Sequence, residues 1–151
     1  MKTKLKVIIP ASIAIILIAV LVIFNIPYNL GKSLRFDEIE RIVMSVSMSG
    51  NIDGQPAFTI GDFSFEKGSD EFTDINKLFA EYSYYLTVGK SVDRADNVKI
   101  ITILVDDDMN RGLYLINSTG SNIIVNGKIY RMKQNKIEEL IDKIANICGL
   151  Q

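Results

Sequence analysis

The sequence contains no histidine and no tryptophan, and its single cysteine is Cys148. Without histidine the chain lacks the commonest acid–base catalyst near neutral pH and the commonest metal ligand. Ser–His and Cys–His nucleophiles are therefore excluded, and the usual glycine-rich phosphate loops are missing as well. One cysteine cannot form an intramolecular disulfide, and a lone thiol near a C-terminus is usually a small buried hydrophobe. We expect a protein that is not an enzyme and has no cofactor.

Outside the N-terminus, acidic residues outnumber basic ones. The chain has 17 Lys and Arg against 18 Asp and Glu. Lys2, Lys4 and Lys6 precede a hydrophobic stretch, so 14 basic residues remain after it and the net charge there is near −4. A surface of this sign repels phosphate backbones, and we therefore expect no nucleic-acid partner.

One long hydrophobic run is present. No charged side chain occurs in residues 7–31, and the dense apolar part is residues 7–26. Twenty helical residues rise about 30 Å, the thickness of a bilayer's hydrocarbon core, and a helix satisfies its own backbone hydrogen bonds in lipid. The apolar residues that we expect to face lipid are Val7, Ile8, Ile9, Ile13, Ile16, Leu17, Val20, Leu21 and Phe24. This pattern predicts a single-pass transmembrane anchor whose partner is membrane lipid.

A cleaved signal peptide is the competing interpretation of the same run. Signal peptides have an apolar core of about 7–15 residues followed by small residues at the cleavage site. Here the core is longer, and residues 24–28 offer no pair of small residues. The three N-terminal lysines favour the cytoplasm. We therefore expect an uncleaved signal-anchor in the cell membrane, with the N-terminus inside and the C-terminal domain extracytoplasmic.

The rest of the chain, roughly 120 residues, is long enough for one hydrophobic core. The expected regions are a cytoplasmic N-terminus (1–6), the transmembrane anchor (7–26), a tether (27–36) and an extracytoplasmic domain (37–151). Alternation of apolar and polar residues, a run of β-branched residues at 98–105 and turn signals together predict strands at 39–49, 57–66, 84–91, 98–105, 113–117, 122–125 and 128–132. A slip in the alternation at Gly61 and Asp62 suggests a bulge, and Asn126-Gly127 is a strong hairpin-turn signal.

Two helices are predicted in the domain. Ser69 caps the first, whose first turn is acidic, and Asn135 is the expected cap of the second, which ends at Gly149. Their apolar stripes are Phe72, Ile75, Leu78, Phe79 and Tyr82 in the first, and Ile137, Leu140, Ile141 and Ile144 in the second. The predicted fold is α+β, with the N-terminal transmembrane helix followed by a small antiparallel sheet and two helices packed on one face.

An acidic cluster is the candidate metal site. Asp106, Asp107, Asp108 and Asn110 share a predicted turn, where carboxylates can bind a hard cation such as calcium. The pattern lacks the glycine and distal glutamate of the helix–loop–helix calcium site. Because Asp and Asn also hydrogen-bond their own backbone in turns, we favour a solvated hairpin turn.

Tyrosines are numerous in the strands. Tyrosine is common at interfaces, where one end of the ring is dry and the other wet. Tyr84, Tyr114 and Tyr130 would make a binding face if they gathered on one side of the sheet. Dispersed, they are ordinary half-buried strand residues, the interpretation that we favour.

Three short segments carry a resemblance. They are Asp37-Glu38-Ile39-Glu40-Arg41-Ile42 at the first strand, Thr87 followed by Ser91-Val92-Asp93 before the long strand, and Gly127-Lys128-Ile129-Tyr130 before the last helix. Over residues 37–144 the chain resembles a family of small uncharacterised extracytoplasmic domains of Gram-positive bacteria. It departs from the family in lacking a proline after Ser91-Val92-Asp93 and a more aromatic strand before Tyr130. The resemblance implies a compact α+β fold and no established activity, so no functional residue is carried over.

These patterns favour a membrane-anchored extracytoplasmic binding or interaction module of unknown ligand, with a protein partner outside the membrane as a further expectation. Two alternatives stay open. One is an accessory or regulatory subunit of another membrane protein. The other is a cation-dependent sensor or enzyme that uses residues 106–110.

Overall fold

A computed structural model of the chain describes residues 2–52, 55–88, 99–105, 111–117 and 122–150. Over these residues the fold is α+β, as predicted, with four α-helices and an eight-stranded antiparallel sheet. The helices are α1 (Lys2–Asn25), α2 (Leu30–Leu34), α3 (Asp70–Glu81) and α4 (Gln134–Ile147), with a 3₁₀ turn η1 at Phe36–Glu38. The strands are β1 (Tyr28–Asn29), β2 (Arg41–Ile52), β3 (Gln55–Glu66), β4 (Ser83–Leu86), β5 (Lys99–Val105), β6 (Arg111–Asn117), β7 (Asn122–Val125) and β8 (Lys128–Arg131).

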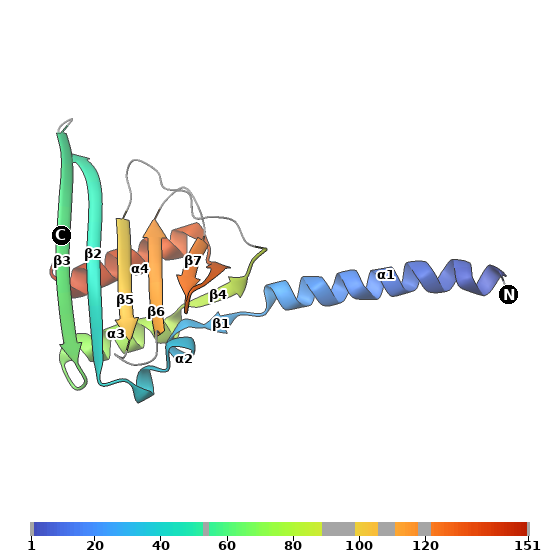
Figure 1. Cartoon of the computed structure of the whole chain (residues 1–151), viewed down its shortest axis with the longest axis horizontal. Helices are drawn as coiled ribbons and strands as arrows, with labels where there is room; N and C mark the ends of the chain where they lie inside the picture. The colour runs from blue at the N-terminus through green and yellow to red at the C-terminus, as the bar shows by residue number, and fades with distance from the viewer. Residues whose placement is uncertain (1, 53–54, 89–98, 106–110, 118–121, 151) are drawn as a thin grey trace.

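The strand order in the sheet is β1-β4-β8-β7-β6-β5-β2-β3 (Figure 1). Strands β5 to β8 form a meander of neighbours, and the β2–β3 hairpin joins it through the pairing of β2 with β5. The turn between β7 and β8 has positive φ at Asn126 (50°) and Gly127 (73°), as the predicted hairpin requires. Helix α3 carries the chain from β3, at one edge, back to β4 near the other.

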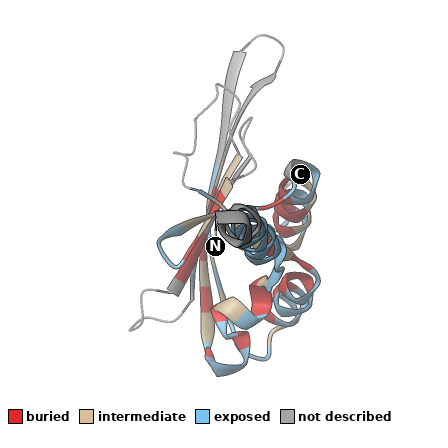
Figure 2. Cartoon of the chain, turned by 90° about the vertical axis from the view of Figure 1, so that its right-hand side faces the viewer, coloured by how far each residue is buried: buried red, intermediate tan, exposed pale blue. Residues whose placement is uncertain are grey.

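Alternate residues of the strands point into one hydrophobic core, because side chains in a strand alternate between the two faces. Figure 2 shows the helices on the same side of the sheet as this core, so the prediction that two helices cover one face is confirmed. The buried strand residues include Ile42, Met44, Val46, Ile101, Ile103, Leu113, Leu115, Ile123 and Val125. The buried helix residues include Phe72, Ile75, Leu78 and Phe79 of α3 and Ile137, Leu140, Ile141 and Ile144 of α4.

The two helix starts differ in how well the sequence predicts them. Ser69 caps α3 as expected, because its hydroxyl oxygen accepts from the Phe72 N–H at 3.1 Å. Helix α4 starts earlier than expected: its cap is Lys133, whose side chain makes no capping hydrogen bond, and the prediction of Asn135 as cap is wrong. Met132, which separates β8 from this cap, is buried in the core.

The predicted bulge in β3 is also wrong. Gly61 pairs with Val46 and Asp62 with Ser45 in an unbroken register. A Cβ atom on Gly61 would lie 2.7 Å from the ring of Phe63, two residues along the same face. Ile60 is exposed on the face opposite the helices, whereas Phe63 packs against the core. The apolar residues therefore change face between these positions without an inserted residue, and Gly61 leaves space for the Phe63 ring.

Residues 27–36, which we expected to be a polar tether, belong to the folded domain. Strand β1 pairs with β4, and the Leu30 N–H donates to the Tyr82 carbonyl oxygen at 2.9 Å. Leu30, Leu34 and Phe36 are buried in the core. These three apolar residues are too few and too spaced to show a helical or strand period, which is why the sequence pattern missed them.

Helix α1 projects from the domain (Figure 1), and Pro10 lies inside it. Nine of its large apolar side chains, between residues 13 and 23, are 43–68 % exposed. Over the residues whose side chains the structure describes, which in α1 begin at Pro10, no helix has the length and apolarity of a membrane span. The transmembrane helix is therefore unsupported by the described part of the chain and stays a prediction.

Candidate functional site

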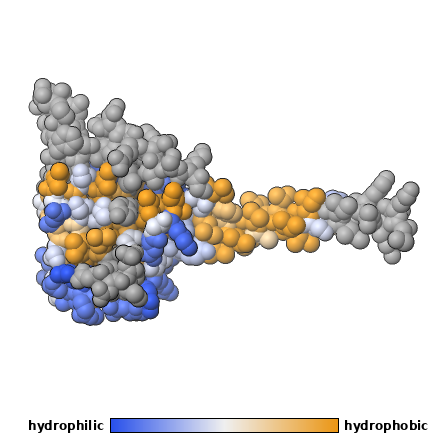
Figure 3. All heavy atoms as spheres, in the orientation of Figure 1, coloured by the Kyte–Doolittle hydropathy of each residue, from blue (hydrophilic) through white to orange (hydrophobic). Residues whose placement is uncertain are grey.

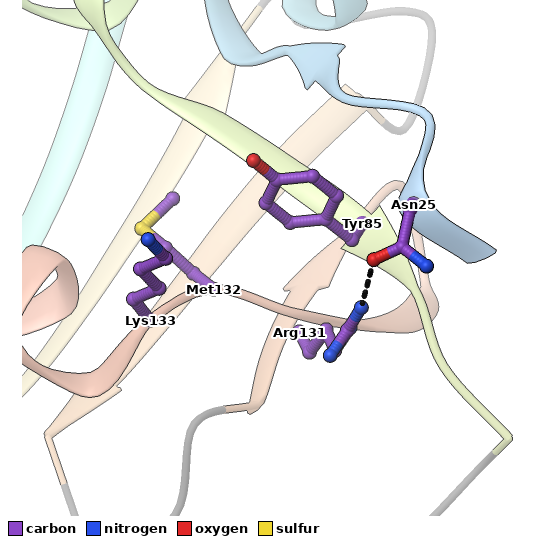
Figure 4. A pocket seen from close by; sticks show the side chains of 5 residues that line it. All are labelled: Asn25, Tyr85, Arg131, Met132 and Lys133. Atoms are coloured by element: carbon purple, nitrogen blue, oxygen red, sulfur yellow. Dashed lines mark hydrogen bonds between the residues drawn. The ribbon is translucent and has the colours of Figure 1, made fainter. Parts of the chain in front are cut away.

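A cavity of about 530 Å³ lies where α1 meets the β4–β8 part of the sheet (Figure 4). We call it the junction groove. It is lined by Asn25, Tyr85, Arg131, Met132 and Lys133. These residues come from the end of α1, from β4, and from the end of β8 with the segment that follows it. The groove therefore depends on how the N-terminal helix joins the domain.

Arg131 connects the two walls of the junction groove. It lies opposite Tyr85 in the pairing of β8 with β4, and its guanidinium carbon is 5.5 Å from the centre of the Tyr85 ring. Its Nη2 donates to the Phe24 carbonyl oxygen at 3.1 Å and to Asn25 Oδ1 at 3.4 Å. The last carbonyl groups of a helix have no helical partner and carry partial negative charge, so this cation stabilises the end of α1.

Lys133 is the second cation of the junction groove. It is exposed, and in the described part of the chain it forms no ion pair. It directly precedes α4, whose first turn contains no acidic residue. The positive end of the helix dipole therefore adds to the charge of Lys133, and none of the groove's described lining residues is a carboxylate.

Three apolar or aromatic side chains near the junction of α1 and the domain are exposed. Val88, which follows β4, is 79 % exposed, and Ile26 and Tyr28 are exposed as well. Figure 1 shows the end of β4 directed towards the base of α1, and the two elements are in contact. Apolar and aromatic side chains are therefore exposed on this part of the domain.

A second cavity of about 200 Å³ continues the junction groove and shares Tyr85, Met132 and Lys133 with it. Its other lining residues are Glu81, Tyr82, Ser83 and Lys136. Charges are largely neutralised in pairs here, unlike in the junction groove. Lys143, for example, lies 3.9 Å from a carboxylate oxygen of Glu81.

Glu139 holds two lysines over the ring of Tyr82. Its carboxylate accepts from Lys136 at 2.5 Å and from Lys143 at 2.9 Å, and these two bonds are the main causes that lower the pKa of Glu139 to about 2. The two ammonium groups lie 5.9 and 5.5 Å from the Tyr82 ring centre. The Tyr82 hydroxyl is buried without a hydrogen bond, and burial is the main cause that raises its pKa. It therefore stays protonated and supplies no base.

Two of the three tyrosines of the predicted binding face, Tyr84 and Tyr130, pack against the core of the domain. Tyr84 is buried, its hydroxyl donates to Ser33 Oγ at 2.8 Å, and its ring packs edge-on against Tyr130 at 4.6 Å between centres. Tyr130 is half-buried and packs against the core. Tyr114 lies opposite Ile124 in the sheet, and its side chain is outside the described ones. The structure thus brings Tyr84 and Tyr130 together as packing residues, and the exposed tyrosine beside them is Tyr28, stacked on Tyr84.

The other predicted site residues are placed as follows. Asp106, Asp107, Asp108 and Asn110 lie outside the described residues. Among the residues that are described, no group of three or more potential metal ligands occurs. Of the anchor residues, Val7, Ile8 and Ile9 are in α1 with side chains outside the described ones, and the others are described in the same helix. Burial raises the pKa of Cys148 to about 11, so its thiol is protonated near neutral pH.

The face of the sheet opposite the helices carries exposed apolar residues, and we call it the open face. Ile60 is 71 % and Leu104 is 49 % exposed. Pairing across the strands places further, partly exposed apolar residues on this face: Val43, Ile100, Ile124 and Ile129. Figure 3 shows hydrophobic residues gathered over the strands on the side turned to the viewer. An apolar patch of this kind marks an interaction surface more often than a scattered single residue does.

Sequence reasoning missed the junction groove entirely. Arg131 and Asn25 are 106 positions apart in the chain, and no motif connects them. The single hint is an arginine and a lysine flanking Met132 at the end of a strand, a pattern too common to predict a site.

Comparison of the chain with protein-family models, with curated proteins and with solved structures finds no match.

Proposed function

We propose that the protein is a membrane-anchored binding module, held by α1, whose folded domain lies against the extracytoplasmic surface of the bilayer. The observation that carries this proposal is an exposed apolar helix joined directly to a domain with its own buried core. Two residues, Ile26 and Pro27, separate α1 from β1.

The energetic argument concerns the apolar side chains of α1. Fully burying a large aliphatic side chain stabilises by about 1.5–3 kcal/mol. Nine such side chains of α1 are about half exposed, so moving them from water into hydrocarbon is favourable by on the order of 10 kcal/mol. The uncharged run extends further in the sequence, over residues 7–26, which is long enough for the hydrocarbon core.

The surface beside α1 supports the same arrangement. A helix that ends in the membrane near Ile26 brings Tyr28, Val88 and Arg131 to the level of the headgroups. Tyrosine and cationic side chains are favourable there, since each has an apolar part and a polar end. Lys2, Lys4 and Lys6 at the other end favour the cytoplasm, which leaves the domain outside.

Flotation of the full chain with vesicles of neutral phosphatidylcholine tests this function. We expect the protein to float with the vesicles and to stay with them in high salt and in alkaline carbonate. High salt is the control, because it screens proteins that are bound by charge alone. A chain that remains in the soluble fraction contradicts the proposal.

A second candidate function is that of an accessory subunit of another membrane protein, and the open face favours it. Antiparallel sheets with one free face usually present polar residues there, whereas Ile60 and Leu104 are exposed on this one. We expect crosslinking in the native membrane to give one protein adduct that persists when α1 is replaced by an unrelated apolar helix.

The variant Ile60→Ser/Leu104→Ser should lose this adduct. Because both side chains are exposed, the substitutions should change the free energy of unfolding by less than about 0.5 kcal/mol each. An adduct that survives this variant but disappears after the helix replacement would instead place the contact on α1.

A further inference from the structure

We propose that the junction groove binds the phosphate-bearing headgroup of an anionic phospholipid. This inference rests on the proposed function, because it needs α1 in the bilayer. The inference assigns a ligand to the groove between the end of α1 and the domain.

The position of the groove indicates a ligand that is itself in the membrane. Asn25 is the last residue of α1 and also lines the groove. The uncharged run ends at about this level, so a helix that spans the hydrocarbon core places Asn25 among the headgroups. A headgroup can then enter the groove while its acyl chains stay beside α1.

The charge of the groove selects an anion. Among the residues that the structure describes, its charged lining residues are Arg131 and Lys133, and its other lining residues are Asn25, Tyr85 and Met132. Arginine presents five N–H donors in a planar fork that matches phosphate, and lysine adds a mobile point charge. The Nη2 contacts of Arg131 hold its guanidinium group beside α1, so the group is already positioned before a ligand arrives.

The cations of the junction groove differ from those of the neighbouring cavity in having no carboxylate partner in the described part of the chain. Lys136 and Lys143, beside Tyr82, are both paired with Glu139. Lys133 has no such partner in the described part of the chain, and Arg131 contacts a carbonyl and an amide oxygen but no carboxylate there. A cavity of about 530 Å³ is within the range of sites that hold small molecules.

Native mass spectrometry of the full chain, released from detergent micelles and titrated with phosphatidylglycerol or phosphatidylcholine, tests the site. We expect the wild-type protein to prefer phosphatidylglycerol, and Arg131→Gln/Lys133→Gln to bind it about 30-fold more weakly, since each cation near an anionic surface contributes comparably. That factor corresponds to about 2 kcal/mol at ~1.4 kcal/mol per tenfold.

The matched control is Lys67→Gln/Lys77→Gln, which removes two exposed cations from the β3–α3 turn and α3. It should keep the wild-type affinity. The single variant Lys133→Gln removes no side-chain hydrogen bond that is seen in the structure, and it should weaken binding about fivefold without affecting folding. Circular dichroism of each variant verifies that the fold is retained.

Three results would overturn the headgroup site. They are equal binding of the two lipids, equal losses in the groove and control variants, and displacement of phosphatidylglycerol by soluble glycerol phosphate at equal concentration. The last would assign the groove to a phosphate compound in solution. A protein that floats with phosphatidylcholine vesicles but shows any of these results retains the proposed function, whereas failure to float removes the function itself.

Discussion

Replacing Leu17 and Leu21 with arginine is expected to release the full chain from membranes. Both side chains are exposed in α1 and lie on one face of the helix, four positions apart. Arginine in the middle of a membrane-spanning helix costs about 2.5–3.5 kcal/mol on insertion scales. Two arginines therefore reduce the ratio of membrane-bound to soluble protein by about 10⁴-fold. The fraction of protein in the pellet after carbonate extraction measures this effect.

The control for this experiment is Leu17→Ile/Leu21→Ile, which preserves the apolar surface of α1. It should remain in the pellet like the wild-type protein. Circular dichroism should show the same strand content in both variants, because neither residue contacts the core of the domain. Retention of the double-arginine variant in the membrane would show that α1 does not hold the protein there.

The substitution Phe79→Ala should give the largest loss of domain stability. Phe79 of α3 heads the largest fully buried side chains, and its ring packs edge-on against Phe36, with 5.1 Å between ring centres. Removing a buried phenyl ring costs about 3–5 kcal/mol, through lost transfer free energy and the cavity that remains. Urea denaturation of the full chain in detergent micelles measures the free energy of unfolding, and an unchanged slope would show that folding stays cooperative.

The control variant is Phe63→Ala in β3. It removes the same ring from a less buried position, and so shows how much of the loss at Phe79 is due to burial. Phe63 is only partly buried and stacks on Phe65, so its loss should cost clearly less than that of Phe79. A loss below about 1 kcal/mol for Phe79→Ala would contradict the core described above. It would also question whether η1, which contributes Phe36, packs against α3.

Local sequence patterns predicted most elements, and their physical reasons hold in the structure. The alternation in β2 and the hairpin signal at Asn126 and Gly127 report which side chains are buried and which backbone angles are allowed. The cap at Ser69 is likewise a contact between near neighbours in the chain. Each of these signals lies within a few residues, so a single sequence contains it.

Local sequence patterns do not predict contacts between residues that are far apart in the chain. The pairing of β1 with β4 and the burial of Leu30 depend on residues more than fifty positions later. The slip at Gly61 resembles a bulge because the apolar residues of β3 change from the open face at Ile60 to the core face at Phe63, a change that the sequence pattern cannot distinguish from an inserted residue. The junction groove requires Arg131 to meet the end of α1, and neither segment signals the other.

The close connection between α1 and the domain has a mechanical consequence. Ile26 and Pro27 alone separate the helix from β1, and proline fixes one of the few backbone angles in between. Arg131 adds a side-chain link across the same joint. If α1 lies in a bilayer as we propose, a change in the tilt of the helix would therefore rotate the domain with it, and a change in membrane thickness would alter the orientation of the open face.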